Sequence, residues 1–458
     1  MGKLFGTDGA RGIAGVDLTC ETAMQIGRAA AIVLTRHAHK KAKIVIGKDT
    51  RISSDMLEAA LVSGMCSVGA DVEILGVIPT PAVAFLVSKY NADAGVMISA
   101  SHNPVEYNGI KLFNNEGFKL SDEIENEIET LISNTPCLNA CEVPTENYNL
   151  KIGAEIGRVF HNSDASKDYV NHIVNSIDGD LSGMKIAVDC ANGSAYDTAK
   201  ELFDALKAET IIINSTPNGV NINHNCGSTY MDSLVALTKT EKCDLGVAFD
   251  GDADRCLAVD ENGEIIDGDK MIAIFSHYMK NNGTLKDNTA VVTVMSNLGF
   301  FHFAKANDIN AVSTQVGDRY VLEEMRKNRY KLGGEQSGHI IFSDYASTGD
   351  GQLSAVQLGK IVKDESKKTS ELSAIMEQLP QVLLGITADS NQKASYANSD
   401  SVKAYIEDYQ KRLGDSGRIL VRPSGTEALI RVMVEGKDND VINKAANDIV
   451  DMIKKEIC

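Results

Sequence analysis

Apolar runs of strand length alternate with amphipathic stretches of helix length along much of the chain. The apolar runs lie at 43–51, 72–77 and 94–104 and end in polar residues, and the amphipathic stretches at 54–69 and 81–90 separate them. A β–α–β–α–β order predicts parallel strands that are joined by crossover helices. We therefore expect an α/β domain in the first part of the chain.

The same alternation returns in the middle of the chain and then changes. It recurs at 184–206 and 244–255 and again at 288–307, which predicts two further α/β units. The last part is predicted as a loop at 386–401, a helix at 401–413 and two strands around a turn at 418–436. We expect three similar α/β domains with mixed, mainly parallel sheets and a smaller α+β C-terminal domain, with bounds 1–153, 154–255, 256–368 and 369–458.

Length, charge and cysteine spacing narrow the class of protein. A chain of 458 residues exceeds one ordinary core, and a net charge of −18 disfavours nucleic acid or an anionic membrane surface as a partner. The nine cysteines form no C-x-x-C pair, which favours reduced thiols over a zinc site. The N-terminus has no apolar signal segment and no apolar run reaches the length of a membrane span, so we expect a cytoplasmic protein.

The first of four polar clusters that could carry chemistry is SASHNP at 99–104, just past a predicted buried strand. Loops beyond the carboxyl ends of parallel strands are the usual ligand sites of open α/β sheets. Pro104 restricts Asn103 to extended conformations, so Ser101 could be a rigidly held nucleophile. The segment alone is more typical of an ordinary serine-rich turn, and a serine hydrolase is disfavoured because G-x-S-x-G is missing.

The second cluster places three carboxylates, Asp250, Asp252 and Asp254, at alternate positions in a predicted tight turn. They repel one another unless a hard cation neutralises them, although a solvated acidic turn stays an alternative. An EF-hand would use these residues and Glu261, but Arg255 stands where its sharp turn needs glycine, and the flanks are predicted as strands. The pattern therefore favours magnesium paired with a phosphate over a calcium loop.

The third cluster is GGEQSGH at 333–339. Glu335 and Ser337 could bind sugar hydroxyls, and His339 has a pKa range suited to proton transfer. By itself this segment is more typical of a structural turn with a packed histidine.

The fourth cluster is RPSGT at 422–426, with Arg431 on the following strand. Its hydroxyls, backbone N–H groups and guanidinium groups could form a nest for a dianionic phosphate, although a hairpin with incidental arginines stays open. The chain has no G-x-x-x-x-G-K-[ST] motif, so nucleotide binding of the P-loop kind is not indicated.

In this order the four clusters resemble the motifs of the α-D-phosphohexomutase superfamily, with one motif on each domain. The resemblance covers essentially the whole chain and extends to FGTDGARG at 5–12 and GKDTR at 47–51. Within the superfamily, the SASHNP, GGEQSGH, VGDRYV (316–321) and RVMVEG (431–436) segments are most similar to members that act on glucosamine phosphates. The resemblance implies four domains around a central cleft.

The resemblance also implies a role for each matching residue. Ser101 would carry the phosphoryl group and would hold one Mg²⁺ together with Asp250, Asp252 and Asp254. The residues implied in proton transfer and charge stabilisation are Lys111, His339, Arg11 and His102. The residues implied in binding the sugar and its phosphates are Glu335, Ser337, Arg255, Arg422, Ser424, Gly425, Thr426 and Arg431.

The implied reaction converts glucosamine 6-phosphate into glucosamine 1-phosphate, on the route to UDP-N-acetylglucosamine. Glucosamine 1,6-bisphosphate would be its intermediate and activator. A homodimer, and phosphorylation of Ser101 by an activating kinase or by autophosphorylation, are further expectations. The alternatives are a phosphomannomutase or phosphoglucomutase of the same superfamily, a catalytically silent sugar-phosphate-binding protein and a metal-assisted phosphatase that uses Ser101.

Two positions depart from the pattern of the superfamily. Ala253 stands where a glycine is usual, and if the position needs a positive φ, alanine costs on the order of 1 kcal/mol. Ala428 replaces a common proline, which should loosen the phosphate loop without removing a contact. Neither change deletes a functional side chain.

Overall fold

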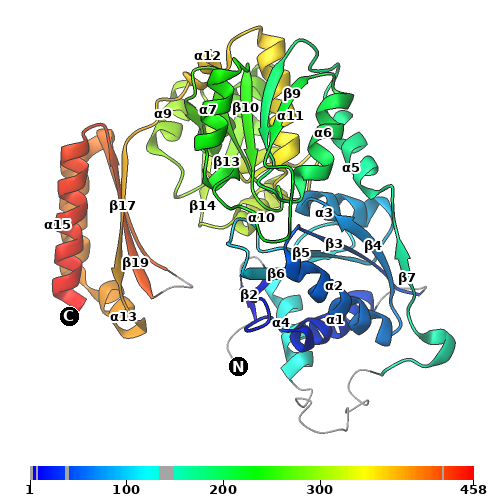
Figure 1. Cartoon of the computed structure of the whole chain (residues 1–458). Coiled ribbons are helices and arrows are strands. Elements are labelled where there is room, and N and C mark those ends of the chain that lie inside the picture. The colour runs from blue at the N-terminus through cyan, green and yellow to red at the C-terminus, as the bar shows by residue number, and fades with distance from the viewer. Residues whose placement is uncertain (1–3, 7–8, 37–40, 134–148, 425–427, 458) are drawn as a thin grey trace. The chain divides into compact units, whose positions relative to one another are not determined.

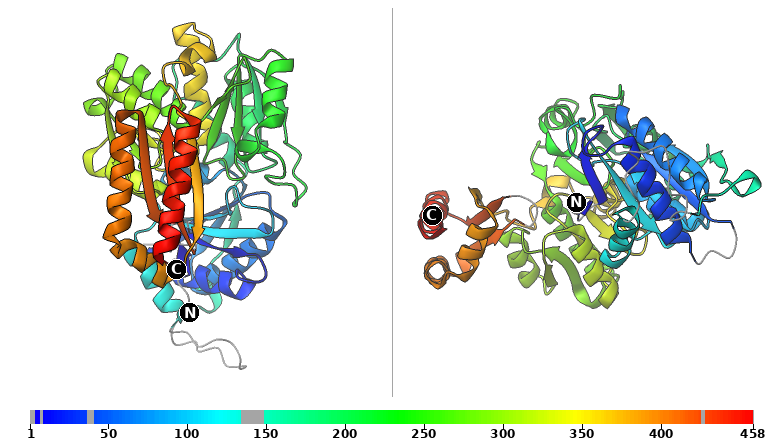
Figure 2. Two further views of the ribbon diagram at one scale, coloured as in Figure 1. Left: turned by 90° about the vertical axis from the view of Figure 1, so that its left-hand side faces the viewer. Right: turned by 90° about the horizontal axis from the view of Figure 1, so that it is seen from below.

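The computed structural model divides the chain into two compact units (Figures 1 and 2). The first unit comprises Met1–Val294 and Ile309–Ala374, and the second comprises Met295–Asp308 and Ile375–Cys458. The residues that the structure describes are 4–6, 9–36, 41–133, 149–424 and 428–457. None of the helices in these ranges combines the length and the apolar composition needed to cross a membrane.

The first sheet of the first unit has seven strands in the order β1-β2-β6-β5-β3-β4-β7. The strands are β1 (Phe5–Gly6), β2 (Gly9–Ile13), β3 (Lys43–Lys48), β4 (Asp71–Val77), β5 (Ala94–Ile98), β6 (Tyr107–Asn114) and β7 (Val159–His161). The helices are α1 (Cys20–Thr35), α2 (Ile52–Ser67), α3 (Thr80–Lys89) and α4 (Asp122–Ser133). β5, β3 and β4 are parallel, which confirms the predicted β–α–β–α–β order.

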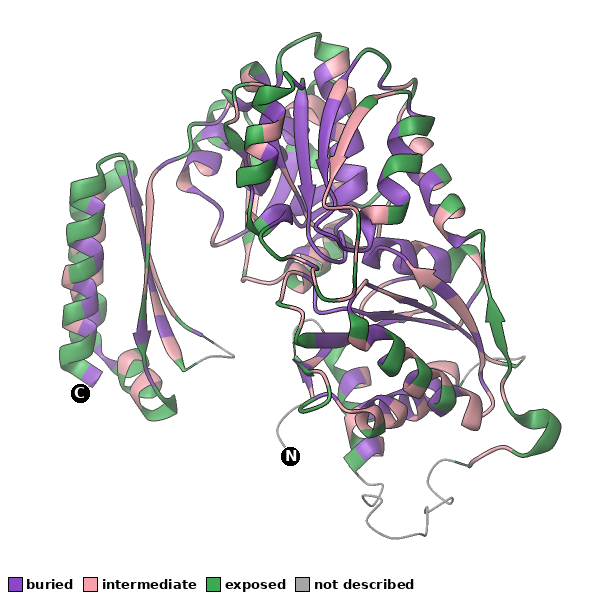
Figure 3. Ribbon diagram, viewed as in Figure 1, coloured by how far each residue is buried: buried purple, intermediate pink, exposed green. Residues whose placement is uncertain are grey.

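Alternating side chains give this sheet two packed faces. Ile44, Ile46 and Val96 belong to the apolar core formed with α1, α2 and α4. On the other face, Gly47 and Gly95 leave room for α3, since a Cβ at either position would lie within 2.7 Å of an apolar side chain. The parallel strands thus have both faces covered, as their continuous apolar runs predict (Figure 3).

The second sheet has five strands in the order β12-β11-β10-β8-β9, and the third has four in the order β14-β13-β15-β16. The strands are β8 (Lys185–Asp189), β9 (Glu209–Ile213), β10 (Leu245–Phe249), β11 (Cys256–Asp260), β12 (Ile265–Ile266), β13 (Thr289–Thr293), β14 (Asn310–Thr314), β15 (Leu332–Gly334) and β16 (Ile340–Phe342). The helices are α5 (Ala165–Val174), α6 (Ala195–Ala205), α7 (Asp232–Thr240), α8 (Gly268–Asn281), α10 (Asp318–Asn328), α11 (Gly351–Glu365) and α12 (Thr369–Ser373).

Two of the sheets extend beyond the domain bounds that we expected from the sequence. β7 pairs with β4, so the first sheet continues past 153. β11 pairs antiparallel with β10, so the second sheet continues past 255. The acidic segment 250–255 is therefore the connection between two neighbouring strands of one sheet.

The second unit is a three-stranded antiparallel sheet in the order β17-β19-β18, with helices packed on it. Its elements are α9 (Leu298–Ala306), β17 (Gln381–Thr387), α13 (Ser390–Asn398), α14 (Asp400–Leu413), β18 (Gly417–Pro423), β19 (Leu429–Gly436) and α15 (Asn439–Ile457). The two strands predicted around a turn are confirmed as β18 and β19. α9 belongs here although 288–307 suggested the third α/β domain, because Asn297 exchanges hydrogen bonds with the backbone of Leu379.

The loop predicted at 386–401 is wrong, because most of that segment is α13. No residue of α13 is buried, so the sequence carried no apolar period that would indicate a helix. The helix begins with a capping box, in which the Asp389 carboxylate accepts from the Gln392 N–H and the Gln392 side chain accepts from the Asp389 N–H. The start of α13 is therefore marked in the sequence by its capping residues and not by an apolar period.

Candidate active site

Ser101 lies in the loop that follows β5 and is only 1% exposed. Its backbone has φ 53°, in the left-handed region that is uncommon for a residue other than glycine. Its N–H donates to Ser99 Oγ at 2.9 Å, and its Oγ donates to Asp250 Oδ2 at 2.6 Å. The loop therefore delivers Ser101 to the acidic connection between β10 and β11.

Arg51 holds this loop from inside the protein. It is fully buried, and its guanidinium donates to the carbonyl groups of Ser101 (3.0 Å), Asn103 (2.8 Å), Pro104 (2.5 Å) and Tyr107 (3.0 Å). It also pairs with the buried carboxylate of Asp49 at 2.9 Å. In the sequence, GKDTR was visible only as part of the resemblance to the superfamily, and we predicted no role for Arg51.

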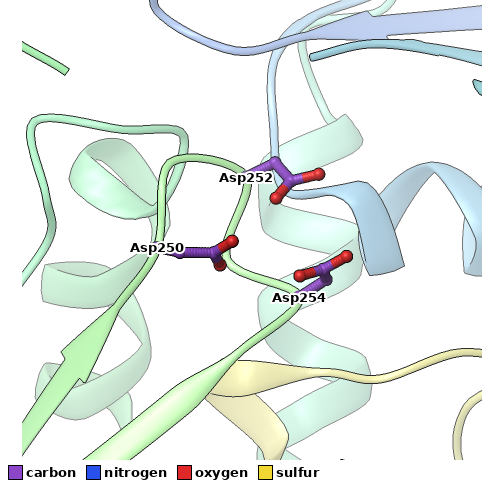
Figure 4. Close-up of side chains that lie close together, drawn as sticks. All are labelled: Asp250, Asp252 and Asp254. Carbon is purple, nitrogen blue, oxygen red and sulfur yellow. The ribbon is translucent and has the colours of Figure 1, made fainter. Parts of the chain in front are cut away.

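The three aspartates converge, as Figure 4 shows. Asp250, Asp252 and Asp254 are buried, and each offers a carboxylate oxygen within 4.8 Å of the others. Burial, and then the charges of Asp254 and Asp252, raise the pKa of Asp250 well above its usual value. The pKa of Asp254 is lowered, because Lys111 and His339 outweigh its burial.

The donor set suits a hard divalent cation. Asp252 Oδ1 and Asp254 Oδ1 are buried without a hydrogen-bond partner among the described residues. Carboxylate oxygens are the ligands that Mg²⁺ takes from proteins, and a cation would satisfy both atoms. The burial and the repulsion that raise the pKa of Asp250 would be offset by the same charge.

Ala253 has φ 55° and is fully buried. The structure thus confirms a positive φ at this position. Its N–H donates to the Asp250 carbonyl at 3.1 Å, and its carbonyl accepts from the Gly351 N–H at 3.0 Å. These contacts hold the alanine in a conformation that costs roughly 1–2 kcal/mol.

Lys111, on β6, reaches the triad from the first sheet. Its Nζ lies 2.7 Å from Asp252 Oδ2 and 3.4 Å from Asp254 Oδ2. Thr80, the first residue of α3, donates from Oγ1 to Asp252 Oδ2 at 2.5 Å. Nothing in the sequence marked Thr80, because its contact depends on where α3 begins relative to a loop 172 residues further along.

His339 reaches the triad from the third sheet. Its Nδ1 lies 3.6 Å from Asp254 Oδ2, and its Nε2 accepts from the Gly349 N–H at 3.0 Å. Although burial opposes it, Asp254 and then Asp318 raise the pKa of His339. Asp318, the first residue of α10, lies 3.5 Å from His339 Nε2 and forms an ion pair with Lys119.

His102 and Arg255 form a pair beside Ser101. Arg255 Nη1 donates to His102 Nδ1 at 3.0 Å. Burial, followed by the charges of Arg255 and Arg11, lowers the pKa of His102 to about 4. His102 is therefore a neutral acceptor at pH 7. Arg11 lies on β2 and pairs with Gly109 of β6. β6 is also the strand that carries Lys111.

The β15–β16 connection carries the third cluster. Glu335 Oε1 accepts from the Gly317 N–H at 3.1 Å, and Ser337 Oγ donates to Glu335 Oε2 at 3.4 Å. The Gly338 carbonyl accepts from the Cys256 N–H at 3.0 Å, which places the loop against the end of the acidic connection. The structure thus brings the first three clusters together in the first unit.

The fourth cluster lies in the second unit. Arg422 on β18 and Arg431 on β19 face each other in the strand register, and the Ser424 N–H donates to the Leu429 carbonyl at 2.7 Å. Lys393, on the unpredicted α13, donates to the Ser424 carbonyl at 2.7 Å and adds a third cation. Gly425 and Thr426 lie outside the described residues.

Sequence models of one family match four segments of the chain. They are described as phosphoglucomutase/phosphomannomutase α/β/α domain I (2–136), domain II (167–263) and domain III (267–379), and the C-terminal domain (362–452). A curated phosphoglucosamine mutase of Clostridium botulinum (strain Loch Maree / Type A3) is 52% identical over 458 residues, which is 100% of both chains.

Solved structures share the fold at low identity. A phosphoglucomutase/phosphomannomutase family protein from Burkholderia thailandensis has a TM-score of 0.82 and 22% identity, with 99% of this chain and 97% of that one covered. The N-acetylphosphoglucosamine mutase of Aspergillus fumigatus, in complex with GlcNAc-6P and magnesium, has a TM-score of 0.72 and 18% identity, with 99% and 96% covered. As its motifs predict, this chain belongs to the phosphoglucomutase/phosphomannomutase family of the α-D-phosphohexomutase superfamily.

Proposed function

We propose that the protein is an isomerase that interconverts glucosamine 6-phosphate and glucosamine 1-phosphate through phospho-Ser101. The observation that carries this proposal is the buried 2.6 Å hydrogen bond from Ser101 Oγ to Asp250, within a carboxylate triad that has two unsatisfied oxygens. The 52% identity to a curated phosphoglucosamine mutase over the full chain supports the choice of sugar.

Asp250, Asp252 and Asp254, together with an oxygen of phospho-Ser101, would hold one Mg²⁺. The ion would supply positive charge beside the transferring phosphoryl group, whose transition state spreads negative charge over three oxygens. Lys111 adds a fixed positive charge through its contacts with Asp252 and Asp254. Arg11 and Arg255 are further candidates for this role.

The reaction has two transfers. The C1 hydroxyl oxygen of glucosamine 6-phosphate bonds to the phosphorus of phospho-Ser101, the bond from phosphorus to Oγ breaks, and a 1,6-bisphosphate forms. After the sugar turns end for end, Ser101 Oγ takes the phosphoryl group from O6 and leaves glucosamine 1-phosphate. In the first transfer the C1 hydroxyl loses its proton and Ser101 Oγ gains one. Lys111, His339 and Arg11 are the candidates for this proton transfer and for charge stabilisation at the reacting oxygen; although burial opposes it, Asp254 and Asp318 raise the pKa of His339.

Substrate positioning is assigned to both units. Glu335 and Ser337 would bind sugar hydroxyls. Arg422, Ser424, Gly425, Thr426 and Arg431 would bind the phosphate that is not reacting, and the register pair of Arg422 with Arg431 supports this assignment.

Ser101 would be loaded by an activating kinase, by autophosphorylation or by the 1,6-bisphosphate, and the protein would act as a homodimer in the cytoplasm. Six cysteines in the described part of the chain are free thiols, which agrees with a reducing compartment.

Turnover of purified protein with Mg²⁺ and a catalytic amount of the matching 1,6-bisphosphate tests the function. We expect glucosamine 6-phosphate to be converted faster than mannose or glucose phosphates, with nearly no free phosphate released. A clear preference for a neutral hexose phosphate would establish the alternative mutase, and stoichiometric phosphate release would establish a phosphatase. Binding without turnover by protein that carries phosphate on Ser101 would establish the silent paralogue.

A further inference from the structure

A cavity of about 520 Å³ lies in the first unit, and none of its lining residues belongs to the segments 99–104 and 250–255 that carry Ser101 and the triad. Its walls come from α3, α5 and α10, labelled in Figure 1, and from the segments 116–118 and 343–347. No described residue to which we assigned a part in the reaction, in metal binding or in sugar binding lines it. Its size is within the range of small-molecule sites.

The cavity has flat, ring-bearing walls. Phe85 and His172 stack with their ring centroids 3.9 Å apart and 14° between the ring planes. Burial lowers the pKa of His172, so its ring is neutral at pH 7 and the stacked pair carries no charge. The guanidinium of Arg326 lies 3.9 Å from the centre of the Phe118 ring, and Tyr345 is a further aromatic residue of the lining. Such surfaces favour a planar ligand, which can stack on a ring or beneath a guanidinium.

Three cations, Arg326, Arg329 and Lys331, line the cavity. Lys331 forms an ion pair with Asp344, and Arg326 lies 3.9 Å from Glu116. Arg329 is exposed, and its guanidinium has no partner in the part of the chain that the structure describes. One cation is therefore available for a ligand.

The remaining acid of the cavity already has donors. Asp350 is 2% exposed, and its Oδ1 accepts from Tyr169 Oη and from the Leu353 N–H, each at 2.9 Å. Its Oδ1 atom therefore already accepts two hydrogen bonds within the protein. The exposed Arg329 is therefore the lining residue that would attract an anionic ligand.

We propose that this cavity binds a small anion that carries a planar ring, of the nucleoside monophosphate class. The ring would lie against the pair of Phe85 and His172, and the phosphate would pair with Arg329. Both halves of the ligand are needed, because an aromatic wall without charge and a single exposed cation are each weak attractors.

Titration calorimetry with uridine 5′-monophosphate tests the proposal, with uridine and ribose 5-phosphate as probes that lack the charge or the ring. We expect saturable binding of the nucleotide to the native protein and at least about tenfold weaker binding of either fragment. Absence of saturable nucleotide binding at millimolar concentration, or equal binding of ribose 5-phosphate, would overturn the proposal.

Two variants locate the binding. Arg329→Asn should weaken nucleotide binding about tenfold, and asparagine tolerates the φ of 59° at this position. Lys327→Asn removes one charge from the last turn of α10, at a residue that does not line the cavity, and this variant should bind the nucleotide as the native protein does. Equal affinity in Arg329→Asn and the native protein would refute the site. Saturation with glucosamine 6-phosphate should leave the nucleotide affinity unchanged, and displacement would assign the nucleotide to the catalytic site and overturn the proposal.

Discussion

Replacing Arg51 with lysine tests whether the buried guanidinium positions the Ser101 loop. The guanidinium donates one hydrogen bond to Asp49 and four to the carbonyl groups of residues 101, 103, 104 and 107. Lysine keeps the charge but has three donors, so at least two of these five hydrogen bonds are lost. A hydrogen bond to a charged group contributes about 1.5–3 kcal/mol, so the loop loses at least about 3 kcal/mol of local stability.

Two effects should be measurable in Arg51→Lys. Amide hydrogen exchange within 99–107 should become about 100-fold faster, because about 1.4 kcal/mol corresponds to a factor of ten. The kcat should fall about 100-fold, since displacing a reacting group by about 1 Å has an effect of this size. Arg36→Lys is a matched control in which neither change is expected, because the ion pair of Arg36 with Glu127 is on the surface, with side-chain exposures of 41% and 47%.

The outcome separates positioning from a purely electrostatic role. Native exchange rates in Arg51→Lys would mean that other contacts hold the loop. A fall in kcat without faster exchange would mean that Arg51 acts through its charge. Either result would refute the reasoning.

Three further variants test the site and its surroundings. Ser101→Ala should abolish mutase turnover and the phosphate on this residue in peptide mass spectrometry, while calorimetry still detects bisphosphate binding; turnover near the native rate would end the phosphoserine proposal. Ala253→Gly should change the free energy of unfolding by less than about 1 kcal/mol in urea denaturation, because relief of the positive φ offsets the lost methyl group, whereas Ala199→Gly in α6 should lose about 2 kcal/mol. A loss in Ala253→Gly as large as in Ala199→Gly would contradict this. Burial raises the pKa of Asp350 from 3.8 to about 6, so its ionisation destabilises the fold increasingly from about pH 4 to pH 6 and constantly above. Asp350→Asn keeps an Oδ1 acceptor and should be more stable than the native protein by up to about 3 kcal/mol at pH 7, with no difference below pH 4 in urea denaturation; a gap independent of pH would refute this.

Local patterns in the sequence were sufficient to predict most strands and the polar loops of the first unit. The apolar runs at β3 and β5 are buried on both faces, so their composition alone indicated strands. The acidic connection after β10 and the SASHNP loop after β5 were visible because polar residues end abruptly after apolar ones. These features depend on near neighbours in the chain.

The features that the sequence did not show depend on distant partners. Thr80 contacts Asp252, and Arg51 binds carbonyl groups about 50 residues away, so neither has a local signal. β7 is three exposed residues, and its membership of the first sheet follows from pairing with β4. Lys393 became part of the fourth cluster only because an unpredicted helix carries it.

The contact of Arg51 with the Ser101 loop also fixes the direction of the peptide groups in that loop. In a trans peptide the N–H points opposite to the carbonyl, so turning the Ser101 carbonyl toward the guanidinium turns the His102 N–H away from it. The same holds for the peptide between Pro104 and Val105. A buried cation on one side of the loop thus directs the positive ends of these dipoles to the other side, where they favour an anion before any substrate arrives.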